Sequence, residues 1–131
     1  MRTFCTALKL LSVAIVLVAS IHVLFGVGAE PWLGAAVSDA SLNDANLDSQ
    51  NRFYGAAFAL FAVVFWYASS DPAQHKRLLQ AAFALFFVAG LARILSIIVV
   101  GWPSIEVLAL TAIELIGPPV MYWWLRQVTK A

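Results

Sequence analysis

The chain has 131 residues, of which 63% are hydrophobic and 11% are charged, and its formal net charge is +1. An ordinary soluble domain is about 45–50% apolar, so this composition indicates a membrane protein instead. One cysteine excludes an intrachain disulfide framework, and no Cys/His cluster has zinc spacing. We therefore predict no metal, no cofactor and no nucleic-acid partner.

Four apolar stretches follow one another, at residues 10–29, 53–70, 78–100 and 107–125. Each is close to the ~20 residues that an α-helix needs to cross a ~30 Å hydrocarbon core. The third contains one charge, Arg93, which costs ~2.5–3.5 kcal/mol at a helix centre, but its many Leu, Ile, Val and Phe side chains outweigh that cost. We predict one all-α domain over residues 1–131, an integral membrane four-helix bundle with helices near 7–28, 51–70, 78–100 and 104–125.

Lysine and arginine residues set the expected orientation. Most of them lie at the N-terminus, between the second and third stretches, and at the C-terminus. Four crossings would put these three regions on one side of the membrane, and the excess of basic residues marks that side as cytoplasmic. Both termini are therefore expected in the cytoplasm, and the long first loop on the outer side.

The first loop, "AEPWLGAAVSDASLNDANLDSQ", is rich in Asp, Asn and Ser. We interpret it as a solvated connector in which "SDASLNDAN" forms a short surface helix capped by Ser38, and Asp48 or Ser49 caps the helix that follows. The alternative is a lid over a pocket. Its aspartates lack the Gly and the closing Glu of a calcium-binding EF-hand loop.

Two charges within the apolar stretches have matching depths. Arg93 lies ~10 Å below the outer end of the third helix, and Glu114 lies ~15 Å below that of the fourth. A tight turn makes these helices antiparallel neighbours, so we predict that the two side chains pair. Pro118 and Pro119 lack N–H groups and leave the carbonyls of Glu114 and Leu115 without helical donors. We expect the side chains of Arg93 and Ser96 to donate hydrogen bonds to these two carbonyls instead.

These charges have two interpretations, which do not exclude each other. One is a structural ion pair that fixes the docking of two helices, and the other is a polar pocket in the outer half of the bundle. His22 lies at a similar depth, and the polar side chains of "DSQNRFYGA" lie at the outer interface, where they are either pocket residues or ordinary interfacial groups. The predicted ligand-binding residues are His22, Asn51, Arg52, Arg93, Ser96 and Glu114.

The motifs "QNRFYGA" (50–56), "GLARILS" (90–96), "GWP" (101–103) and a glutamate before two prolines resemble the bacterial family catalogued as domain of unknown function 4345. The resemblance extends from the first helix to the fourth. It implies a small four-helix membrane protein of a bacterium, whose expected place is the inner membrane, and it implies no reaction.

Three functions remain open. The first is binding of a small amphipathic molecule of the quinone, lipid or isoprenoid type, with its head on Arg93 and its body among Phe58, Phe86 and Leu110. The second is an accessory or scaffold subunit, alone as a homo-oligomer or within a larger membrane complex. The third is an isomerase-type enzyme using Glu114 or His22, which ranks last because no nucleophile–base–orienter set is present.

Overall fold

A computed structural model describes residues 1–130, which form helices joined by turns and loops, with no strand in that range. Its elements in chain order are α1 (Arg2–Phe25), the 3-10 helix η1 (Gly26–Leu33), α2 (Asp39–Leu42), α3 (Ala45–Ala68), α4 (Lys76–Val100) and α5 (Ile105–Val128). The all-α prediction is confirmed, and the 3-10 helix is an element that the sequence patterns did not predict.

Three segments are long and apolar enough to cross a membrane: Arg2–Leu33, Lys76–Val100 and Ile105–Val128. They mark the chain as a membrane protein. The fourth long helix, α3, is not among them, because its first two turns carry polar residues such as Asp48, Asn51 and Arg52.

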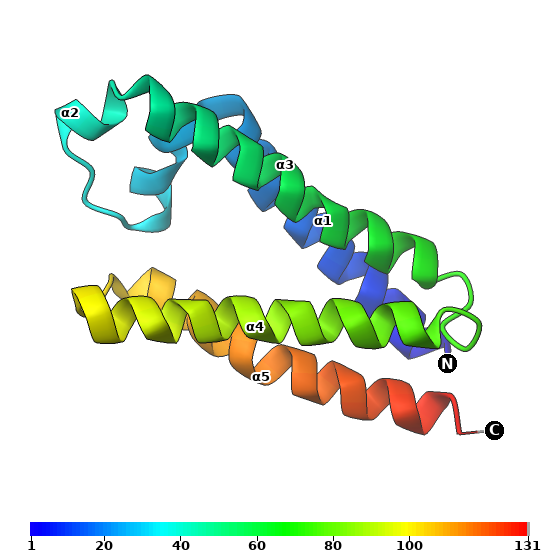
Figure 1. Cartoon of the computed structure of the whole chain (residues 1–131). Helices are drawn as coiled ribbons and strands as arrows, with labels where there is room; N and C mark the ends of the chain where they lie inside the picture. The colour runs from blue at the N-terminus through cyan, green and yellow to red at the C-terminus, as the bar shows by residue number, and fades with distance from the viewer. Residues whose placement is uncertain (131) are drawn as a thin grey trace.

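The four long helices form two antiparallel hairpins, one of α1 with α3 and the other of α4 with α5. Figure 1 shows that the hairpins meet where the N-terminus, the end of α5 and the α3–α4 connection lie, and that they diverge toward the opposite end. We call these the terminal end and the loop end. The loop end holds η1, α2 and the turn between α4 and α5 (Figure 1).

The shared core lies at the terminal end, where apolar side chains of all four long helices meet. Phe4, Leu8, Phe65, Leu79 and Leu125 are its largest fully buried side chains. Aromatic packing between α3 and α4 extends the core toward the middle, with ring centroids 5.5–5.9 Å apart in the pairs Phe65–Phe83 and Phe58–Phe86. Van der Waals packing of these side chains holds the hairpins together at this end, since lipid provides no hydrophobic driving force between membrane helices.

Toward the loop end each hairpin keeps its own packing. Gly55 of α3 lies against α1 so closely that an added Cβ would be 2.7 Å from His22 Cβ and 3.1 Å from the Ala19 carbonyl oxygen. The missing side chain at Gly55 therefore lets α1 and α3 approach closely. In α4, by contrast, no residue beyond Gly90 is buried.

The first loop is ordered by side-chain caps. The Ser38 hydroxyl accepts a hydrogen bond from the Ser41 amide and starts α2, as predicted. The predicted cap of α3 at Asp48 or Ser49 is wrong, because Asp44 accepts hydrogen bonds from the amides of Asn46 and Leu47 and starts the helix earlier. The first helix ends at Phe25, short of the expected residue 28, because the chain tightens into η1 at Gly26, where φ is 56°.

Candidate functional site

The predicted partners Arg93 and Glu114 join α4 to α5. The Arg93 Nε–H donates to Glu114 Oε2 over 2.7 Å. The Glu114 side chain is only 9% exposed, whereas that of Arg93 is 40% exposed. The predicted pairing is confirmed, and it supplies the compensating charge that a buried carboxylate requires.

The absence of a side chain at Gly90 brings the two helices close at this level. A Cβ there would lie 3.1 Å from the Glu114 carbonyl carbon and 2.9 Å from Leu115 Cδ2. The prolines at 118 and 119 lie within α5 one turn further on, so the Glu114 and Leu115 carbonyls lack their helical donors here, as expected. The expected donation from Arg93 and Ser96 to these carbonyls is absent within residues 1–130, where Arg93 instead bonds the Glu114 carboxylate.

Part of the hydrogen-bonding capacity of the pair is unused. Both terminal NH2 groups of Arg93 and the Oε1 atom of Glu114 have no partner among the described residues. Along α4, Gly90 follows Phe86 by four residues and Arg93 follows Gly90 by three, so Arg93 lies on the same helix face as these two buried residues. The Arg93 side chain is 40% exposed, so these unused groups are accessible at the surface of the α4–α5 hairpin.

An apolar cavity of about 170 Å³ lies on the side of the terminal end, about one turn of α5 from Glu114 and two turns of α4 from Arg93. Phe86 of α4 and Gly117 and Met121 of α5 line it, and these positions share helix faces with Arg93 and Glu114. Ala7 and Leu11 of α1 and Phe65 of α3 close its other side, so both hairpins contribute to it.

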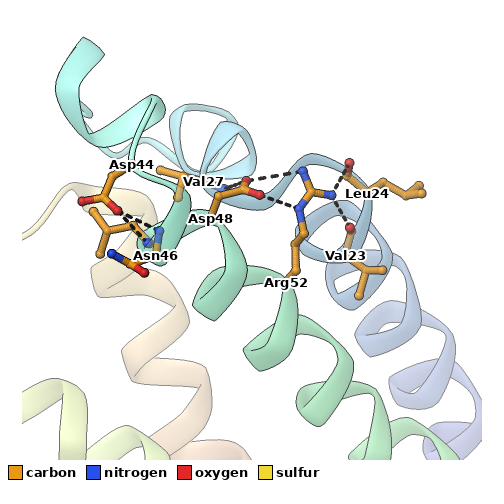
Figure 2. A network of polar contacts seen from close by, with 8 residues as sticks. Val23, Leu24, Val27, Asp44, Asn46, Asp48 and Arg52 are labelled. Atoms are coloured by element: carbon orange, nitrogen blue, oxygen red, sulfur yellow. Dashed lines mark hydrogen bonds and ion pairs between the residues drawn. The ribbon is translucent and has the colours of Figure 1, made fainter.

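Arg52, a predicted ligand residue, is used to hold the end of α1. Figure 2 shows its guanidinium between the Asp48 carboxylate and two carbonyls of α1. Its Nε–H donates to Asp48 Oδ2 over 2.7 Å, and Nη1 donates to the carbonyls of Val23 and Leu24 over 2.7 and 3.0 Å. These carbonyls belong to the last turn of the helix, where no intrahelical donor is available.

Asp48 completes this network by accepting a hydrogen bond from the amide of Val27 in η1, over 3.3 Å (Figure 2). The hydrogen bonds from Arg52, with a smaller contribution from the Val27 amide, hold the pKa of the Asp48 carboxyl below its ordinary value. This pairing was not among the predictions, although the spacing of four residues between Asp48 and Arg52 on one helix is a usable sequence signal for it.

His22 and Asn51 meet at Glu30, another residue that the sequence analysis did not select. The Asn51 Nδ2 donates to Glu30 Oε1 over 2.6 Å, and His22 Nε2 lies 3.6 Å from the same oxygen. His22 Nδ1 lies 2.8 Å from the Val18 carbonyl oxygen of its own helix. No sequence signal marked Glu30, because only the fold of η1 brings it back over α1 and α3.

A second cavity, of about 480 Å³, lies between α3 and the first loop. Of the predicted residues it includes Asn51. The rest of its lining is Val27, Ala36, Val37, Ser38, Ser41, Leu47, Gln50 and Tyr54. The first loop also reaches the other hairpin, since Gly34 lies against the Glu106 carboxylate of α5.

The six predicted residues thus occupy separate places. Arg93 and Glu114 form one pair, His22 and Asn51 share Glu30, Arg52 holds the end of α1, and Ser96 is exposed, with no hydrogen bond from its hydroxyl within residues 1–130. No group of three or more His, Cys, Asp or Glu residues in the described chain is arranged to hold a metal ion.

The model of the family described as Domain of unknown function (DUF4345) matches residues 4–125. No curated protein and no solved structure matches the chain.

Proposed function

Since the chain belongs to the family described as Domain of unknown function (DUF4345), a description that specifies no activity, we propose its function from the geometry: it binds the polar head of an amphipathic molecule at Arg93 within the membrane. The proposal includes α3 as a fourth crossing, both termini in the cytoplasm and the loop end on the outer side. The distribution of Lys and Arg supports this orientation.

One observation carries the proposal. The two terminal NH2 groups of Arg93, a residue in a helix long and apolar enough to span the membrane, have no partner in residues 1–130. An unsatisfied polar group in the hydrocarbon region costs several kcal/mol, so these donors need acceptors from outside the chain. A bound head group supplies them, and the nearby apolar cavity takes part of the attached chain.

The structural alternative has its own observation, because the bond between Arg93 and Glu114 already joins two helices. An accessory subunit would need this pair only for packing. In the binding function the pair also holds a ligand, whereas in the accessory function it does not. Measuring bound ligand in variants that still fold therefore distinguishes the two functions.

The test is native mass spectrometry of protein purified in a mild detergent. Wild type should carry a bound small molecule. The double variant Arg93→Leu/Glu114→Leu should lose it while keeping its thermal unfolding midpoint within a few degrees of wild type, because the double variant leaves no lone charge. Equal adducts on both proteins, or none on wild type, would favour the accessory-subunit function.

A further inference from the structure

We propose that the ligand at Arg93 is an electrically neutral, single-chain amphiphile whose head carries both a carbonyl-type oxygen and a hydroxyl group. This inference rests on the proposed function and names the chemical class that the site selects. Three observations carry it: the unused atoms of the pair, the charges around it and the size of the cavity below it.

The unused atoms of Arg93 are hydrogen-bond donors, and the unused atom of Glu114 is an acceptor. The terminal NH2 groups of Arg93 can only donate, and Glu114 Oε1, as part of a carboxylate, can only accept. A head group that satisfies both must therefore accept and donate at neighbouring atoms. A carbonyl oxygen with a hydroxyl close by has this arrangement, whereas a sulfate or a fully ionised phosphate has acceptors only.

The charge of the surroundings disfavours an anion. Glu114 neutralises Arg93 directly, and Arg52, the other cation of the loop end, is already bound to Asp48. The acidic residues of the same end are Glu30, Asp39, Asp44, Asp48, Glu106 and Glu114. An anionic head placed on Arg93 would lie beside the Glu114 carboxylate, and like charges at such distances cost several kcal/mol.

The cavity has room for part of one chain and not for two chains side by side. Its volume of about 170 Å³ is below the ~300–1,000 Å³ of pockets that enclose a complete drug-sized ligand. The rise along α5 from Glu114 to Gly117 is ~4.5 Å, so a chain attached to a head at the pair enters the cavity within a few bonds. Two acyl chains would not fit there.

The experiment compares two probes with the same oleyl chain. Monoolein is neutral and has an ester carbonyl and hydroxyl groups, and oleyl sulfate is permanently anionic. Each is titrated into delipidated protein in a nonionic detergent and bound mass is followed by native mass spectrometry. We expect wild type to bind monoolein at least about tenfold more tightly than oleyl sulfate.

The variant Glu114→Gln should reverse this preference, because it leaves Arg93 as an uncompensated cation. Glu106→Gln, at an exposed carboxylate of the same helix, is the matched control and should keep the wild-type preference. If Glu114→Gln does not fold, the wild-type preference still decides the question.

Tighter binding of oleyl sulfate to wild type would overturn the neutral-ligand inference and leave the proposed function standing. Binding of neither probe to wild type, or equal binding to the Arg93→Leu/Glu114→Leu variant, would overturn both.

Discussion

The two arginines near the loop end have opposite surroundings. Arg52 donates hydrogen bonds to Asp48 and to two carbonyls of α1. Arg93 donates to one carboxylate oxygen, and its terminal NH2 groups have no partner within the described chain. The first arrangement completes a helix end. The second leaves binding capacity at membrane depth, which is why we assign the ligand to Arg93.

The Arg93–Glu114 bond should appear in a double-mutant cycle. Arg93→Leu and Glu114→Leu should each destabilise the protein, and the double variant should be less destabilised than the sum of the two, because a lone buried charge is worse than none. Within membranes such couplings are about 0.6–1.7 kcal/mol. Unfolding in mixed micelles measures them, and additive losses would show that the two side chains do not interact.

The Arg52–Asp48 contact predicts an acid-dependent change. A carboxyl whose pKa is lowered in the folded state contributes stability at pH values above its unfolded pKa, and this contribution is lost as the pH falls through the folded pKa. Arg52→Gln should therefore raise the pKa of Asp48. The chemical shift of the Asp48 carboxyl carbon, followed by NMR as the pH is lowered, measures this pKa. An unchanged pKa in Arg52→Gln would show that Arg52 is not the cause of the lowered value.

At the scale of helices, glycines determine how closely each hairpin packs. Gly55 of α3 packs against α1, and Gly90 of α4 packs against α5 beside the Glu114 backbone. Close approach through small residues is a common way for membrane helices to associate, since lipid provides no hydrophobic driving force between them. The candidate site therefore depends on a contact that is apolar and steric.

Two glycine variants test this contact. Gly90→Val should lower stability by about 1–3 kcal/mol, because its side chain overlaps Leu115 and the Glu114 backbone. Gly117→Ala in α5 is the control, since an added Cβ there meets nothing within 4 Å, and it should be neutral or stabilise by up to ~1 kcal/mol. Thermal melts in detergent compare them, and equal effects would exclude a close contact at Gly90.

The sequence predicted helix identity and the Arg93–Glu114 pair, because the lengths of apolar stretches and the depths of charges follow directly from helix geometry. It did not predict where Arg52 and Glu30 act. Both depend on η1, which turns back over the ends of α1 and α3, and the pattern of apolar residues carries no signal for that turn. The separation of Arg93 and Glu114 from the other predicted residues follows instead from the divergence of the two hairpins (Figure 1).

At the scale of the whole molecule, the divergence of the hairpins could not be read from the sequence. In a membrane, side chains that face lipid and side chains that face another helix are both apolar, so periodicity does not distinguish them. The structure resolves this by placing the shared core at the terminal end and leaving the loop-end half of α4 with no buried residue beyond Gly90 (Figure 1).

The proposed orientation has a direct test in intact cells. In a Cys5→Ser background, Ala40→Cys in α2 should react with a membrane-impermeant maleimide added from outside. Gln74→Cys in the α3–α4 connection should react only after the membrane is opened. Both positions are exposed on the protein. The opposite labelling pattern would reverse the orientation, and labelling of both from outside would mean that α3 does not cross.

The central claim is that an amphiphile lies between the hairpins with its head at Arg93 and its chain in the apolar cavity. Photo-crosslinking with a monoacylglycerol that carries a diazirine near the end of its chain tests this most directly. We predict crosslinks at cavity residues such as Phe86 and Met121, which disappear in Arg93→Leu/Glu114→Leu. Crosslinks confined to exposed side chains of α4 such as Leu95 and Ile98, and unchanged in that variant, would contradict the claim.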